Sequence, residues 1–150
     1  MNSGPLLSDL QAAGLMPQLD DHARSTYPEE CCGLIVREGG TLRAIPCDNL
    51  QNEMHAKYPE DFARTAATAY YIDPKHILEH QDQLCCIYHS HPDHGAYFSE
   101  EDQLVAAPFG EPNFPGMTYL VLSVMGGELA DRQVFAWSVT EEKFTSSPHD

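Results

Sequence analysis

Three histidines, two serines and several carboxylates are gathered in one stretch of the sequence, IYHSHPDHGAYFSEED, from Ile87 to Asp102. His89 and His91 stand two residues apart in an apolar segment that predicts a β-strand, so both side chains project from the same face of that strand. The strand rise separates the two residues by roughly 7 Å, which lets their imidazoles converge on one ion with bonds of about 2 Å. The pair therefore predicts a zinc site.

Ser99 and Asp102 stand three residues apart at the start of a predicted helix, so both side chains can point the same way. Asp102 is then a candidate third ligand, and two histidines, one carboxylate and an open fourth position are what a hydrolytic zinc needs. The same SEED segment is also a capping box with an acidic first turn, in which Ser99 caps the helix. Because this segment closely follows HSHP in the sequence, a role of Asp102 as metal ligand is favoured over a role as helix cap alone.

Hydrolysis at zinc also needs a base that takes a proton from water and passes it to the leaving amine. Glu29 and Glu30 precede the predicted buried strand CCGLIV, where partial desolvation would raise the pKa of a carboxyl group toward the working range. By the pattern alone, a glutamate in such a place is more often a solvated turn residue than a catalytic base.

Together these two segments resemble a known family. HSHPDHGAYFSEED resembles the motif of the JAMM metalloproteases, also called MPN+ or JAB domains, and YPEECCGLI is similar to that family's upstream proline-x-glutamate-x-cysteine-glycine element. The resemblance covers about residues 16–139. It implies that His89, His91 and Asp102 bind one catalytic Zn²⁺ ion.

The resemblance also implies that Glu30, two residues after Pro28, is the general acid and base, and that Ser99 hydrogen-bonds the oxyanion. It further implies a zinc peptidase or isopeptidase acting on the C-terminal tail of a ubiquitin-like or sulfur-carrier β-grasp protein. The short loop after Asp102 has no added histidine or cysteine, which argues against a second zinc. The compact architecture resembles that of bacterial stand-alone members of the family.

Other assignments of these residues compete. HILEH, from His76 to His80, fits the inverted zinc protease pattern, but surface histidines on a helix are the better account. His94 could replace Asp102 as a ligand. A position that lines the groove or supports the metal ligands through hydrogen bonds is favoured. Tyr97 and Phe98 are loop anchors or groove walls, and packing is favoured for Phe98.

The elements that must position these residues follow from periodicity and turn signals. The predicted strand at 84–92 places Cys85, Ile87, His89 and His91 on one face and Cys86, Tyr88 and Ser90 on the other. The other predicted elements are helices at 16–26, 74–79 and from 99, strands at 31–38, 41–48, 69–74, 118–124 and 133–139, and a polar excursion with some helix at 49–67. The predicted class is α+β with a curved mixed sheet flanked by helices, as in the MPN/JAB fold.

The chain of 150 residues has the size of one domain. We expect an N-terminal extension at 1–15, the metalloprotease domain at 16–143 and a frayed tail at 144–150. The first residues lack the basic start of a signal peptide and the length of a membrane span. Five cysteines without CxxC spacing are typical of reduced, buried residues in a cytoplasmic protein.

The formal charge of −15 comes from 8 Lys and Arg against 23 Asp and Glu. Such a surface argues against nucleic acid or an anionic membrane as a partner. Two functions other than the β-grasp peptidase stay open: a non-catalytic scaffold of the same fold, and a phage tail-assembly protease.

Overall fold

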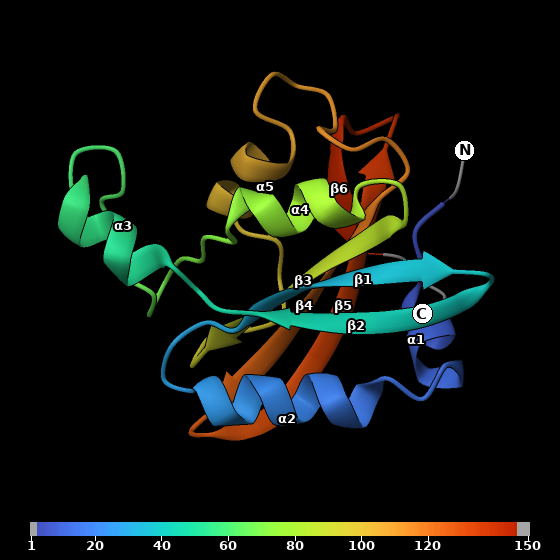
Figure 1. The fold of residues 1–150 in the computed structure, drawn as a ribbon, viewed down its shortest axis with the longest axis horizontal. Coiled ribbons are helices and arrows are strands. Elements are labelled where there is room, and N and C mark those ends of the chain that lie inside the picture. Colours follow the sequence, from blue (N-terminus) through green and yellow to red (C-terminus); the bar gives the residue numbers. More distant parts are fainter. Residues whose placement is uncertain (1–2, 147–150) are drawn as a thin grey trace.

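The computed structural model describes residues 3–146, which form a six-stranded mixed sheet with helices on both faces (Figure 1). The helices are α1 (Leu7–Ala12), α2 (Met16–Thr26), α3 (Gln51–Lys57), α4 (Pro74–His80) and α5 (Glu100–Ala106). The strands are β1 (Cys32–Glu38), β2 (Thr41–Cys47), β3 (Leu84–Pro92), β4 (Thr118–Met125), β5 (Glu128–Ser138) and β6 (Lys143–Ser146). The predicted α+β class with a mixed sheet is confirmed.

The sheet has the order β2-β1-β3-β4-β5-β6, and only the central pair β3 and β4 is parallel among these strands. Two tight hairpins account for much of this order. The β1–β2 turn uses Gly39 and Gly40, both at positive φ, a conformation that glycine adopts at little cost. The β4–β5 turn uses Gly126 and Gly127 in the same way. Each glycine pair lies between two strands predicted from the sequence, at 31–38 and 41–48 or at 118–124 and 133–139.

The two faces of the sheet carry separate apolar cores. Helices α1 and α2 cover one face, where Leu10 and Leu19 pack with Tyr88 of β3 (Figure 1). Helices α4 and α5 lie over the other face, where Ile77 and Ala106 pack with Ile87 of β3. Strand β3 is buried almost along its whole length because both of its faces are covered. The end of β3 is therefore a rigid platform for side chains.

The strand predicted at 69–74 does not form. Residues 69–73 have no regular secondary structure, and Pro74 begins α4. The segment is held largely by the Asn49 side chain, which donates to Ala69 O at 3.0 Å and accepts from Tyr71 N at 3.0 Å. Only one backbone hydrogen bond, from Leu50 N to Tyr71 O at 2.9 Å, accompanies these contacts. A side-chain amide thus replaces the strand ladder that the apolar pattern predicted.

The predicted alternation along β3 holds from Ile87 onward and is wrong at Cys85. The pairing with β1 shifts between Ile35 and Val36, so Ile35 pairs with Cys86 and Val36 with Leu84. Cys85 is left over in this bulge and packs in the same core as Cys86. All five cysteines are buried and free, as predicted.

Both predicted terminal segments contribute to the fold. The segment expected as an N-terminal extension forms α1, with Leu10 fully buried, and Pro5 O accepts a hydrogen bond from the Thr118 hydroxyl at 2.8 Å. At the other end, Phe144 is buried in β6, so 144–146 are not frayed, while 147–150 lie outside the described residues. The domain boundaries themselves stay predictions.

Between residues 3 and 146, no helix is long and apolar enough to cross a bilayer.

Candidate metal centre

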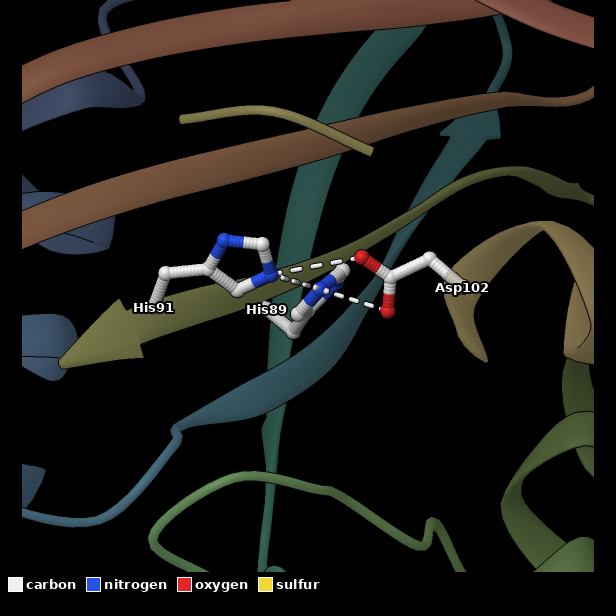
Figure 2. A group of neighbouring side chains, drawn as sticks. All are labelled: His89, His91 and Asp102. Carbon is white, nitrogen blue, oxygen red and sulfur yellow. Dashed lines mark hydrogen bonds and ion pairs between the residues drawn. The ribbon is translucent and has the colours of Figure 1, made fainter. Parts of the chain in front are cut away.

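His89 and His91 project from the end of β3 toward Asp102 at the start of α5 (Figure 2). The Nε2 atoms of the two histidines are 3.2 Å apart. His89 Nε2 is 3.2 Å from Asp102 Oδ1, and His91 Nε2 is 3.2 Å from Asp102 Oδ2. The spacing of two residues on a strand and the capping geometry of a helix thus bring three candidate ligands to one point.

This spacing fits a zinc ion. Two ligands on bonds of about 2.0–2.1 Å at a tetrahedral angle are about 3.3 Å apart, close to the observed separations. Within the described part of the chain, these three residues are the only group of three or more histidine, cysteine or acidic side chains close enough to hold a metal ion. With three protein ligands, a fourth position remains for water or substrate.

The hydrogen bond between His91 Nδ1 and Gly95 O fixes the tautomer of the His91 imidazole. Its Nδ1 is 2.9 Å from Gly95 O, and because a carbonyl only accepts, Nδ1 carries the hydrogen. In a neutral ring, Nε2 then presents a lone pair toward the carboxylate of Asp102. A lone pair facing carboxylate oxygens is repulsive unless a cation or a proton lies between them, so the arrangement favours a bound cation.

His89 is fully buried, and its ring stacks on Tyr70 at a centroid distance of 4.6 Å. Burial lowers the pKa of His89, which outweighs the opposite effect of the Asp102 charge. The imidazole is therefore neutral at pH 7, and its contact with Asp102 is a hydrogen bond rather than an ion pair. Its Nδ1 is buried and has no hydrogen-bond partner among residues 3–146.

Asp102 is both a candidate ligand and a helix cap. Ser99 Oγ accepts from Asp102 N at 3.1 Å, and Asp102 Oδ2 accepts from Ser99 N at 3.0 Å, so the capping box is present as well. Burial acts to raise the pKa of Asp102, but the histidines and the Ser99 N–H hold it well below its usual range. An ionised carboxylate beside a neutral His89 is the protonation state that binds a metal.

Glu30 is the glutamate that reaches this site. Its side chain is only 5% exposed and lines the same cavity as His91 and Asp102, whereas Glu29 is exposed and accepts from Asn52 Nδ2 at 2.8 Å. Burial, with the Asp102 charge adding to it, raises the pKa of Glu30 to about 9, although Arg64 opposes this shift. Of the two glutamates, Glu30 is thus the one that lies beside the His-His-Asp group.

The backbone beside Glu30 is tied to the histidine strand through Ser90. Cys31 N donates to Ser90 Oγ at 2.8 Å, and Ser90 N donates to Cys31 O at 3.1 Å. Glu30 N donates to Ala66 O at 2.8 Å on its other side. Ser90, which stands between the two histidines, was not singled out in the sequence, yet it ties the backbone next to Glu30 to the strand that carries both histidines.

A cavity of about 240 Å³ opens onto the ligands. Its walls are Glu30, Arg64, Thr68, His91, His94, Tyr97, Ser99 and Asp102. Arg64 comes from the polar excursion at 49–67 and Thr68 directly follows it, and no spacing or composition signal could have found either residue. His94 lines the cavity without joining the ligand group.

The two loop aromatics take different places. Phe98 packs in the core, with its ring 5.2 Å from Phe135 and 5.5 Å from Phe144, as favoured from the sequence. Tyr97 is half exposed and lines the cavity, with its ring 5.1 Å from that of His91. His76 and His80, the rival zinc pair, lie on α4 and belong to no metal-binding group in the described chain.

The fold and the site define a mixed-sheet α+β domain that carries a His-His-Asp group able to hold a metal ion. The chain belongs to the prokaryotic homologs of the JAB domain, whose family model matches residues 12–140. This confirms the family that the two sequence motifs indicated and makes the protein a compact JAB/MPN domain.

Three known proteins show how far the similarity extends. Tail tip assembly protein K of Escherichia phage N15 is 33% identical over 85 residues, which are 55% of this chain and 30% of the phage protein. The chain thus matches less than a third of that relative's length.

Solution structures from Desulfitobacterium hafniense and Salinibacter ruber give TM-scores of 0.61 and 0.56, each at 22% identity. The first comparison covers 89% of this chain and 86% of the other, and the second covers 98% and 88%. At this identity, both comparisons support the fold alone.

Proposed function

We propose that this protein is a zinc-dependent peptidase or isopeptidase that cleaves at the C-terminal tail of a ubiquitin-like or sulfur-carrier β-grasp protein. The observation that carries the proposal is the convergence of His89, His91 and Asp102 beside the buried carboxyl group of Glu30 in one cavity. His89, His91 and Asp102 would hold the ion. Zinc bound there would supply Lewis-acid activation of a water molecule and of a peptide carbonyl.

Glu30 would act as the general base and then as the general acid. It would take a proton from the attacking water and return the proton to the departing amine. Its raised pKa shows that the site disfavours a negative charge, and a cation held by the neighbouring ligands would lower that pKa toward neutrality. A group that titrates near neutral pH can do both tasks.

Ser99 would stabilise the oxyanion that develops on the carbonyl oxygen. Its oxygen accepts from Asp102 N, and its hydroxyl hydrogen has no acceptor within residues 3–146. The hydroxyl therefore remains available to donate into the cavity, which Ser99 lines.

The substrate class rests on the family resemblance and on the shape of the site. A cavity of about 240 Å³ next to the ligands suits small residues at the cleaved bond, such as the glycines that end β-grasp tails. An extended tail would be recruited by backbone hydrogen bonds. The family resemblance and the small cavity thus support a β-grasp tail as the substrate.

The first test compares the zinc-loaded protein with Glu30→Gln on β-grasp proteins that bear native tails, C-terminal extensions or lysine-linked targets. Intact mass identifies the cut. We expect cleavage after the tail glycine by the wild type and a loss of several orders of magnitude in Glu30→Gln, with zinc retained. Glu29→Gln is the matched control and should cleave normally, because Glu29 is exposed and does not line the cavity.

Cleavage in phage tail assembly is the second candidate function, favoured by the similarity to tail tip assembly protein K. Adding the tail tip proteins of phage N15 to the panel separates the two. A cut in a tail tip protein, with every β-grasp tail intact, would support this alternative. No cut in any protein, with zinc bound, would support a non-catalytic scaffold.

A further inference from the structure

A second cavity, of about 460 Å³, lies directly beside the metal-site cavity. The two cavities share Arg64, Thr68 and Asp102 as wall residues. The remaining walls are Gln51, Asp61, Phe62, Ala63, Ala69, Tyr70, Tyr71, Glu101 and Val105. Because Asp102 belongs to both sets, the second cavity begins at a metal ligand.

Half of the wall residues of this second cavity are apolar or aromatic: Phe62, Ala63, Ala69, Tyr70, Tyr71 and Val105. Phe62 and Tyr71 form an edge-to-face pair with centroids 5.3 Å apart, and Val105 of α5 lies at the rim. Side-chain contacts hold the aromatic segment: His55 Nδ1 donates to Phe62 O at 2.7 Å, and Tyr71 N donates to Asn49 Oδ1 at 3.0 Å. An aromatic wall fixed in this way is a preformed subsite for an apolar group.

Arg64 and Glu101 form an ion pair of 3.4 Å where the second cavity adjoins the ligands. Both side chains are about half exposed, so the pair adds little to stability and separates easily. The pair also neutralises the charge of Arg64, which leaves Asp61 as the other acidic group on the wall besides Asp102. These charges on the cavity wall disfavour an acidic side chain of a substrate.

We propose that the second cavity is a subsite for a large apolar side chain of the substrate, near the cleaved bond, and that it determines specificity. The proposal rests on the proposed peptidase function. In an extended peptide, each residue advances by about 3.3 Å. A residue close to the scissile carbonyl can therefore place its side chain past Asp102, between Phe62 and Val105. Glycine would leave the subsite empty, and glutamate would face Asp61.

Two neighbouring residues of α5 provide a matched pair of variants. Val105 lines the second cavity and is 62% exposed, whereas Leu104 does not line it and is 60% exposed. Val105→Trp fills the rim, and Leu104→Trp adds a tryptophan to the same helix outside the cavity. Their equal exposure makes both substitutions compatible with folding, which thermal unfolding of each variant verifies.

The activity arm uses the substrate that the wild type cleaves, with Phe, Gly or Glu placed in turn at each of three positions on both sides of the cut. We expect one position at which kcat/KM favours Phe over Gly by at least about tenfold, and at which Val105→Trp removes the preference while Leu104→Trp keeps it. A flat panel, or equal effects of the two variants, would overturn the subsite.

The binding arm needs no catalysis. N-acetyl-phenylalanine amide, with the glycine and glutamate amides as controls, is titrated into the metal-free protein and followed by amide chemical shifts. Saturable shifts at Phe62, Tyr71 and Val105, seen only with the phenylalanine probe and lost in Val105→Trp, support the subsite even if no substrate is ever cleaved. Shifts that do not saturate, or that persist in Val105→Trp, overturn it.

Discussion

At the scale of single residues, Glu30 holds a carboxyl group where water hardly reaches it. Its pKa of about 9 in the metal-free protein compares with about 4.5 for an ordinary glutamate. The folded state therefore keeps a proton between pH 4.5 and 9 that the unfolded chain releases, so the free energy of unfolding falls as pH rises through this window. This loss of stability is a consequence of burying the carboxyl group of Glu30 beside the Asp102 carboxylate.

Glu30→Gln should remove this cost. In EDTA, we expect the free energy of unfolding of the wild type to fall relative to the variant by up to about 1.4 kcal/mol per pH unit between pH 5 and 9. Urea denaturation at several pH values measures the difference. Curves for the two proteins that stay parallel over the whole range would show that Glu30 has an ordinary pKa.

Asp102 and Ser99 share one capping box but have different predicted roles. Ser99→Ala should keep zinc and lose about 1 kcal/mol of stability, because only the cap is removed. Asp102→Ala should lose zinc in addition. Isothermal titration with zinc, alongside denaturation of the metal-free variants, separates the two effects. Equal zinc affinity in both variants would mean that Asp102 is a cap and not a ligand.

At the scale of elements, the close pairing of β1 with β3 places Glu30, two residues before β1, near the histidines of β3. Gly33 of β1 pairs with Tyr88 of β3, and the Tyr88 ring lies across the glycine. A Cβ at Gly33 would be 2.4 Å from that ring, which is fully buried and whose hydroxyl is 2.8 Å from His22 Nδ1. Neither the ring nor its partner can move freely.

Gly33→Ala should therefore lower the free energy of unfolding by about 1–3 kcal/mol, the usual cost of an overpacked core. Thermal or urea denaturation measures the loss. Gly95→Ala is a suitable control, because nothing lies within 4 Å of a Cβ built there and its φ is not positive. If the two variants are equally stable, the ring contact does not constrain the strand pair.

At the scale of the whole molecule, a bound ion would join α5 to the sheet. Helix α5 buries only Ala106 among its residues, while Asp102 at its start meets two ligands on β3. Zinc bound at this group in the folded state would stabilise that state by about 2.7 kcal/mol at a free concentration 100 times the Kd. For a domain of this size, that corresponds to a rise in Tm of about 5–10 °C.

Differential scanning calorimetry with and without EDTA measures this rise. The double variant with His76→Ala and His80→Ala should show the same rise as the wild type, because α4 holds no ligand of this group. Asp102→Ala should show none. A rise that disappears in the α4 double variant would place the ion on α4 and contradict the assignment.

Much of the site could be predicted because its parts are set by local geometry. Alternation on a strand puts His89 and His91 on one face, and the first turn of a helix orients Ser99 and Asp102, whatever surrounds them. The glycine pairs at 39–40 and 126–127 likewise determine their own hairpins. Backbone periodicity acts over a few residues, so the sequence alone indicates these features.

Features that join distant segments depended on the tertiary structure. Glu30 reaches the ligands because β1 pairs with β3 in a register that puts Cys32 opposite His89, and no local pattern sets that register. Asn49 replaces a predicted strand at 69–74 with side-chain hydrogen bonds. The excursion that it anchors carries Arg64 to the site and builds the wall of the second cavity.

The family, the His-His-Asp group and the elements that bear it could be recognised in the sequence, because motif spacing and backbone periodicity are local. The fold was needed to show which glutamate is buried, where Arg64 lies and that a second cavity adjoins Asp102. These depend on how segments far apart in the chain pack together, and packing is a property of the whole fold.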